Sequence, residues 1–216
     1  RMKIRKNKNL KTYNTFGIDC TADCIIHIKT EKEVRSFFKK EFSWKKPLLI
    51  LGGGSNILFI NNFKGTILCP EVGRIRIEKK DKENVIVSAG AGLKWDKLVE
   101  WTVTRGFGGF ENLSLIPGHV GAVPVQNIGA YGVEAKDSIM KVKTISVTDG
   151  SIRFFTNDEC QFGYRNSIFK SKEKGKYLVT RVWFRLKVNP EINIGYGSLK
   201  DEIKKIGTPI LKNIRK

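Results

Sequence analysis

Residues 111–132 read ENLSLIPGHVGAVPVQNIGAYG, a segment with four glycines, two prolines and a single carboxylate. The segment holds no lysine or arginine, although 28% of the chain is charged. Its glycines let the main chain approach a bulky ligand, and Gln126 and Asn127 offer hydrogen bonds to a polar edge. An irregular loop packed on the core would explain the apolar residues, but not an amide pair between Gly-Pro turns. Because the segment itself is almost uncharged, it indicates a site for a bulky planar ligand that is buried without competing ions.

A second glycine-rich segment, LGGGSNILF at residues 51–59, follows a predicted buried strand. Successive N–H groups without a Cβ can converge on an anion. The loop lacks the Lys-Ser/Thr of a triphosphate-binding loop and the G-x-G-x-x-G spacing of a dinucleotide turn. Taken alone, it is more typical of a tight turn between strands. Together, the two segments match a flavin ring with a ribityl-phosphate arm, with GGGSN holding the diphosphate.

The hydrophobic pattern around these segments predicts an α+β fold rich in strands. Strands are expected at residues 24–28, 47–51, 66–69, 85–89, 139–147, 151–155 and 177–188. Helices are expected at residues 31–42, 93–104 and 198–206, the second of them ending before Gly106. The first twelve residues read as a loose lead-in. We expect a smaller lobe over residues 1–70 and a larger one over residues 71–216.

The longest predicted strand, residues 177–188, has an alternating pattern. Alternation places Arg181, Arg185 and Lys187 on one face. The other face is expected to carry the apolar residues Leu178, Val182, Phe184, Leu186 and Val188.

The chain carries 40 lysines and arginines against 21 carboxylates, a net charge of +19. Such an excess favours anionic partners, including nucleic acid, anionic membrane and phosphorylated small molecules. The basic residues are spread along the chain, with no arginine-rich arm, so a solvated lysine-rich surface is the favoured interpretation and nucleic-acid binding the weaker one. No apolar segment reaches membrane-spanning length and no secretory signal is present, which predicts a soluble, cytoplasmic protein.

The four cysteines, Cys20, Cys24, Cys69 and Cys160, lack the paired spacing of a zinc site. We expect reduced thiols and no metal. His27 has no partner motif in the sequence and is interpreted as structural.

Three segments, in this order and at these separations, resemble the UDP-N-acetylenolpyruvoylglucosamine reductase family. They are LGGGSNIL at 51–58, ENLSLIPGHVGAVPVQNIGAYGVE at 111–134 and CQFGYRNSIFK at 160–170. Asn14-Thr15-Phe16 matches the family's N-terminal motif, and Gly195-Tyr196-Gly197 resembles the tyrosine loop of its type I branch. The resemblance runs from about residue 10 onward. It implies an FAD-binding fold of the vanillyl-alcohol-oxidase (PCMH) type with two α+β subdomains.

In that family, NADPH reduces FAD, and the flavin passes hydride to the enolpyruvyl group of a nucleotide sugar, giving UDP-N-acetylmuramate for peptidoglycan. The resemblance implies that Arg165 is catalytic, as a fixed cation beside the developing enolate. It implies that Tyr164 and Tyr196 contact the substrate. The cofactor, noncovalent FAD, would be held by Gly52, Gly53, Gly54, Ser55, Asn56, Ile57, Ile116, Pro117, Gly118, Val120, Gly121, Pro124, Gln126, Asn127, Ile128, Gly129, Ala130 and Gly132.

The sequence departs from the family pattern at His119, where a small residue such as threonine is usual. Related flavin oxidases attach FAD covalently through histidine; a polar neighbour of a noncovalent flavin is the favoured interpretation here. The family's serine proton donor has no match, because the Gly-Ser pairs at 54–55, 150–151 and 197–198 lack its Gly-Ser-Phe-Phe context.

We therefore expect the substrate-binding third domain, and the segment completing the first domain, to be missing, either in a fragment or in the product of a shortened gene. The predicted result is FAD binding with little or no complete turnover, and self-association through the surface left exposed. The alternative interpretation is a catalytically incomplete FAD-binding or interaction module.

Overall fold

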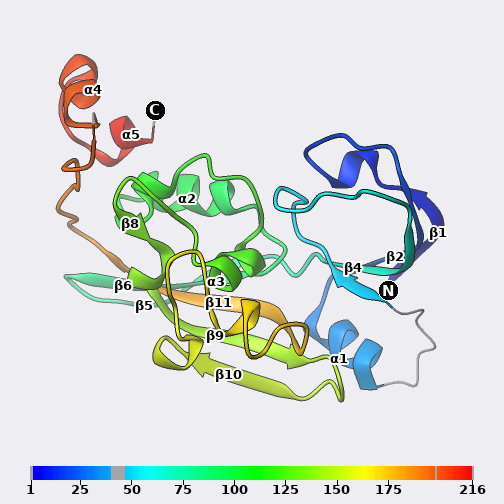
Figure 1. Cartoon of the computed structure of the whole chain (residues 1–216). Coiled ribbons are helices and arrows are strands. Elements are labelled where there is room, and N and C mark those ends of the chain that lie inside the picture. The colour runs from blue at the N-terminus through cyan, green and yellow to red at the C-terminus, as the bar shows by residue number, and fades with distance from the viewer. Residues whose placement is uncertain (1, 40–46, 198, 216) are drawn as a thin grey trace.

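Two β-sheets, each made from one part of the chain, lie side by side in the computed structural model (Figure 1). The structure describes residues 2–39, 47–197 and 199–215. The first sheet has the strand order β1-β2-β4-β3, and the second has the order β10-β9-β11-β6-β5. With helices packed on both sheets, the fold is α+β, as the sequence predicted.

The first sheet consists of β1 (Lys3–Asn9), β2 (Thr21–Ile28), β3 (Leu48–Ile50) and β4 (Phe63–Pro70). β1 runs antiparallel to β2, whereas β2 and β3 are both parallel to β4. The prediction that the first twelve residues form a loose lead-in was wrong, because β1 lies at the edge of this sheet. Its KIRKNKN sequence is almost entirely exposed, so it has no apolar alternation that would indicate a strand.

The second sheet is wholly antiparallel. It consists of β5 (Ile75–Lys80), β6 (Asn84–Gly90), β9 (Ile139–Ser146), β10 (Ile152–Thr156) and β11 (Tyr177–Lys187). The helices α2 (Trp95–Val103) and α3 (Val123–Gln126) cover one of its faces (Figure 1). α2 ends ahead of Gly106, whose φ of 75° suits the predicted stop.

A bulge in β11 changes which side chains share a face. Its register against β9 shifts between Val179 and Arg181, so one extra residue is inserted there. Leu178 therefore packs with Ile145 on one face, while Val182, Phe184 and Leu186 pack in the core on the other. The prediction that Leu178 shares the face of Val182 was wrong for this reason.

The helix α1 (Glu31–Lys39) packs between the two sheets. Its apolar residues Val34, Phe37 and Phe38 form one buried cluster with first-sheet residues and with Ile145 and Leu178 of the second sheet. Residues 40–42, where the predicted helix would continue, lie outside the described residues. Because this cluster takes side chains from both sheets, the two sheets share a core.

Two short helices end the chain at the upper left of Figure 1: α4 (Leu199–Ile206) and α5 (Leu211–Ile214). α4 confirms the predicted helix; Ser198 lies outside the described residues. Arg215 binds the Asp96 carboxylate through both terminal nitrogens, at 2.6 and 2.7 Å, and so holds α5 against the start of α2. None of the helices in the described part of the chain has the length and apolar character needed to cross a membrane.

The remaining elements are short. They are the two-residue strands β7 (Gly129–Ala130) and β8 (Val133–Glu134) and the 3-10 turns η1 (Lys11–Tyr13), η2 (Glu111–Leu113), η3 (Val120–Ala122), η4 (Ala135–Asp137), η5 (Asp158–Cys160) and η6 (Ile168–Lys170). The division at about residue 70 stays a prediction; the first sheet's last strand ends at Pro70 and the second sheet's first strand begins at Ile75.

Candidate functional site: a cavity between the two sheets

A cavity of about 750 Å³ lies where the first sheet meets the second. Its walls come from β3 and the GGGSN loop on one side, and from residues 117–128 and 169–179 on the other. This volume lies within the range of about 300–1,000 Å³ that is usual for small-molecule sites. The two glycine-rich segments, distant in sequence, thus form opposite walls of one cavity.

The GGGSN loop is held by close backbone contacts that only glycine allows. A Cβ on Gly54 would overlap the carbonyl oxygen of Tyr13, and Gly54 has a φ of 69°. The Thr15 N–H donates to the Gly54 carbonyl at 3.2 Å. A Cβ on Gly53 would come within 3.0 Å of the Gly118 Cα. The loop is therefore pressed between the N-terminal segment and the opposite wall.

Asn14 gives the N-terminal segment its shape. Its buried side chain donates to the carbonyls of Leu10 and Ile18, at 2.9 and 3.1 Å, and accepts from the Ile18 N–H at 2.9 Å. These bonds close the loop that carries Tyr13 and Thr15 against Gly54. The Asn-Thr-Phe motif is thus a support for the cavity wall.

Two side-chain bonds join the facing walls. The Asn56 amide donates to the Gln126 side-chain oxygen at 2.8 Å, and the Ser55 hydroxyl donates to the Pro117 carbonyl at 3.4 Å. Both bonds connect GGGSN to the second glycine-rich segment, residues 111–132.

The part of the opposite wall formed by residues 118–121 is joined by backbone hydrogen bonds to residues 91–95. Trp95 N–H donates to Gly118 O, Val120 N–H to Leu93 O and Gly121 N–H to Ala91 O, each at 2.9 Å. A Cβ on Gly121 would lie 2.8 Å from that of Ala91, so this close approach also requires glycine. The backbone around the wall residues is thereby fixed.

His119 lines the cavity within this fixed segment. Its Nδ1 atom is buried and has no hydrogen-bond partner among the described residues. Burial, and then the charge of Lys94, hold the pKa of His119 below its usual value. The imidazole is therefore neutral at pH 7.

The structure separates the predicted cofactor residues into two groups. Those that line the cavity are Gly52, Gly53, Gly54, Ser55, Asn56, Ile57, Pro117, Gly118, Gly121, Gln126 and Ile128. Those that lie outside its lining are Ile116, Val120, Pro124, Asn127, Gly129, Ala130 and Gly132.

Asn127 illustrates the second group. It is fully buried with a φ of 43°, and its side chain donates to the Gly163 carbonyl at 3.0 Å. The same side chain accepts from the Lys136 N–H at 3.0 Å. Asn127 therefore joins the segment that follows α3 to the loop that carries Arg165.

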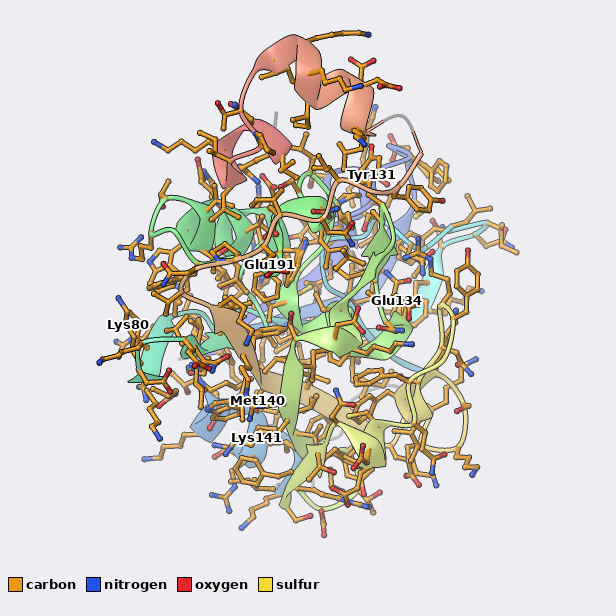
Figure 2. All side chains as sticks on the ribbon, turned by 90° about the vertical axis from the view of Figure 1, so that its left-hand side faces the viewer. Lys80, Tyr131, Glu134, Met140, Lys141 and Glu191 are labelled. Carbon is orange, nitrogen blue, oxygen red and sulfur yellow. The ribbon has the colours of Figure 1, made fainter. Side chains whose placement is uncertain are left out.

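The predicted catalytic and substrate residues meet at the β7–β8 hairpin, outside the cavity lining. Arg165, in a left-handed conformation (φ 51°), donates to the Gly129 carbonyl at 2.6 Å. The Tyr196 ring lies edge-on to Tyr131 of the hairpin turn, with ring centroids 6.4 Å apart. Tyr164 is 86% exposed beside Arg165. Figure 2, which views the left-hand side of Figure 1, shows Tyr131 turned toward the viewer on the face away from the first sheet.

The cavity also has walls that sequence reasoning missed. Lys170 and Lys174 line it, and its described lining contains no aspartate or glutamate. Lys170 Nζ also donates to the Arg165 carbonyl at 3.0 Å. The basic run KSKEKGK at residues 170–176 was the available signal, but it resembles the lysine-rich segments elsewhere in the chain. Two cations without a counter-charge favour an anionic ligand.

The cysteines contribute no chemistry to this site. All four are unpaired, and burial raises the pKa of Cys69 and Cys160 to about 12. Among the described residues, no three histidine, cysteine or carboxylate side chains gather in a way that could hold a metal ion.

Taken together, the cavity fits a ligand with an anionic centre and apolar ends. The glycine cradle and the lysines suit the anion, the unpartnered His119 Nδ1 offers one more polar contact, and aliphatic and aromatic side chains provide most of the remaining lining.

Comparisons with known proteins agree with this description. Residues 22–156 match the protein family described as "FAD binding domain". The chain is 42% identical over 216 residues to the UDP-N-acetylenolpyruvoylglucosamine reductase of Flavobacterium johnsoniae, covering 99% of this chain and 64% of that protein. It is 40% identical over 206 residues to the enzyme of the same name from Pseudomonas aeruginosa, covering 95% of this chain and 60% of that protein.

Two solved structures share the fold. The crystal structure of UDP-N-acetylenolpyruvylglucosamine reductase from Thermus caldophilus superposes with a TM-score of 0.66 at 26% identity, covering 88% of this chain and 64% of that one. A solvent-stable cholesterol oxidase superposes with a TM-score of 0.59 at 13% identity, covering 86% of this chain and 38% of that one, and supports the fold alone. The predicted FAD-binding fold of the vanillyl-alcohol-oxidase type and the predicted family resemblance are confirmed.

Proposed function

Because the chain belongs to the FAD-binding domain family, we propose that it binds FAD noncovalently in the cavity between the two sheets. One observation carries this proposal: a glycine cradle and two lysines face a lining without carboxylates. The diphosphate of FAD matches the cradle and the lysines, and its two ring systems match the apolar walls. A covalent bond to histidine would form at the flavin ring. His119 instead faces Gly52 of the cradle, where the diphosphate would lie, so a noncovalent complex is favoured.

We propose further that the chain is the flavin-holding part of a UDP-N-acetylenolpyruvoylglucosamine reductase. The reaction would use NADPH to convert UDP-N-acetylglucosamine enolpyruvate to UDP-N-acetylmuramate for the cell wall. Identities of 42% and 40% to two reductases of this name support the assignment. The chain spans 64% and 60% of their lengths, so complete turnover is a separate question from flavin binding. When bound, FAD supplies the hydride.

Arg165, Tyr164 and Tyr196, near the β7–β8 hairpin, would act on the nucleotide sugar. The hydrogen bond to Gly129 holds the Arg165 guanidinium in one place, so a positive charge would face the substrate carboxylate as the enolate forms. Tyr164 and Tyr196, both exposed near the same hairpin, would contact the sugar nucleotide. The adjoining cavity would hold the flavin within reach of this hairpin.

We place the protein in the cytoplasm, where NADPH and nucleotide sugars are made. We also propose that it self-associates. Phe16, Leu58 and Ile60 are 66%, 59% and 83% exposed beside the cradle loop, and exposed apolar side chains of this size favour association. Light scattering over a concentration series tests this proposal; a monodisperse monomer at high concentration would count against it.

The first test of the proposed function is the visible absorption spectrum of the purified chain, before and after saturation with FAD and gel filtration. We expect a flavin spectrum that remains with the protein, and release of free FAD after denaturation. Circular dichroism of the same sample establishes that the chain is folded. A folded chain that takes up no FAD would overturn the proposal, and a flavin that stays on the denatured chain would overturn noncovalent binding.

A further inference from the structure

His119 differs from the other cavity residues in one respect. Three buried side-chain atoms in the described part of the chain lack a hydrogen-bond partner: Asn84 Oδ1, Asn112 Oδ1 and His119 Nδ1. Of these three residues, only His119 lines the cavity. A buried polar atom without a partner is unfavourable, so folded proteins rarely keep one without a purpose or a ligand.

The backbone prevents His119 from moving away. Gly118 accepts a hydrogen bond from Trp95, and Val120 donates one to Leu93, so both neighbours of His119 are bound to the α2 side of the wall. The His119 carbonyl itself accepts from the Ala122 N–H at 2.9 Å. The His119 backbone is therefore fixed at the cavity wall, and the residue is part of the cavity lining.

The imidazole lies against the first glycine of the cradle. A Cβ built on Gly52 would be 3.7 Å from the His119 Cβ and 3.8 Å from its Nδ1. The unpaired nitrogen is thus beside the loop whose N–H groups are suited to an anion. Because burial and Lys94 keep the ring neutral, His119 can add a hydrogen-bond donor here without adding a charge.

We propose that His119 donates a hydrogen bond through Nδ1 to the diphosphate of the bound dinucleotide, and so selects FAD over flavins without a diphosphate. The inference rests on the proposed function, because it needs FAD in the cavity. It assigns His119 a direct binding role and gives the buried nitrogen a partner.

The test uses the whole chain, two ligands and two substitutions. His119→Leu removes the donor, whereas His119→Asn keeps an N–H close to the position of Nδ1. Dissociation constants for FAD and riboflavin are measured by flavin fluorescence titration. A hydrogen bond to a charged group is worth a factor of roughly 10 to 100 in affinity. We expect His119→Leu to lose that factor for FAD and to bind riboflavin within about threefold of the unsubstituted chain. We expect His119→Asn to recover most of the FAD affinity.

A second readout separates binding from folding. Without flavin, His119→Leu should have a melting temperature equal to or above that of the unsubstituted chain, because it removes an unpaired buried nitrogen. Asn84→Ala, which changes another buried unpaired atom away from the cavity, should leave FAD affinity unchanged.

Three results would overturn the inference: unchanged FAD affinity in His119→Leu, equal losses for FAD and riboflavin, or no recovery in His119→Asn. An unsubstituted chain that binds no FAD would overturn the proposed function as well. Binding of FAD by the unsubstituted chain with no effect of His119→Leu would overturn this inference alone.

Discussion

The side-chain amide of Asn56 donates a hydrogen bond to the side-chain oxygen of Gln126 at 2.8 Å, joining residues 70 positions apart in sequence. One residue belongs to the GGGSN loop and the other to α3 on the facing wall. The bond therefore fixes the width of the cavity at this point.

Removing either partner should loosen both walls. We expect Asn56→Ala and Gln126→Ala each to weaken FAD binding by about 2- to 10-fold, which corresponds to a partly exposed hydrogen bond. The double variant should lose no more than the worse single variant, because the two side chains act as a pair. Fluorescence titration of all four proteins measures this coupling. Asn166→Ala, an exposed residue outside the cavity lining, is the matched control, and additive losses would contradict the pairing.

Gly54 and Gly52 should respond differently to the same substitution. Alanine at Gly54 needs a left-handed backbone and overlaps the Tyr13 carbonyl, whereas alanine at Gly52 meets only ordinary contacts with His119. We expect Gly54→Ala to lower the free energy of unfolding by about 2–4 kcal/mol. Gly52→Ala should change it by less than about 1 kcal/mol. Urea denaturation of both variants checks the contrast, and equal stabilities would mean that Tyr13 does not press on the loop.

Arg165 should matter for catalysis and not for holding the flavin. Because it lies at the β7–β8 hairpin outside the cavity lining, Arg165→Met should keep FAD affinity within about threefold. In any preparation of this protein that reduces the enolpyruvyl nucleotide sugar, the same change should lower kcat by roughly 100- to 1,000-fold. Flavin titration and an NADPH oxidation assay measure the two effects. A large loss of FAD affinity would place Arg165 at the cofactor instead.

The Asp96–Arg215 pair should give a pH-dependent contribution to stability. Hydrogen bonds from Arg215, and also from the Leu115 N–H, hold the pKa of Asp96 below its usual value. A carboxylate with a lowered pKa stabilises the fold above its unfolded pKa of about 3.9 and loses that effect as pH falls through the folded pKa. Asp96→Asn should therefore cost about 1–2 kcal/mol at pH 7, and the difference should shrink below about pH 4. Urea denaturation at several pH values checks this, with Asp201→Asn, an exposed pair, as the control. A difference that stays constant with pH would contradict it.

Sequence patterns located both glycine-rich walls because these segments need backbone positions that only glycine takes. A Cβ at Gly54 would overlap the Tyr13 carbonyl, one at Gly121 would crowd the Ala91 Cβ, and one at Gly53 would be in tight contact with Gly118. That requirement is local and is visible in the sequence. Lys170 and Lys174 reach the cavity only through the packing of η6 against α3, so no local pattern separates them from other lysines.

The partners of His27 could not be found from a local sequence pattern either. Its Nε2 shares a hydrogen bond with the Tyr13 hydroxyl at 3.1 Å, and its Nδ1 shares one with Glu71 at 2.7 Å. Tyr13 is also the residue whose carbonyl presses on Gly54. The three side chains come from η1, β2 and the residue after β4, so only the folded first sheet brings them together. The structural interpretation of His27 was therefore reached without the partners that explain it.

The buried cluster around α1 ties the stability of the two sheets together. Ile145 and Leu178 from the second sheet are buried with Val34, Phe37 and Phe38 from the helix that precedes β3. A cut near residue 70 would leave apolar side chains exposed on both pieces. The sheets are thus separate walls for a ligand but share part of one core, so separating them would expose apolar surface and cost stability in both.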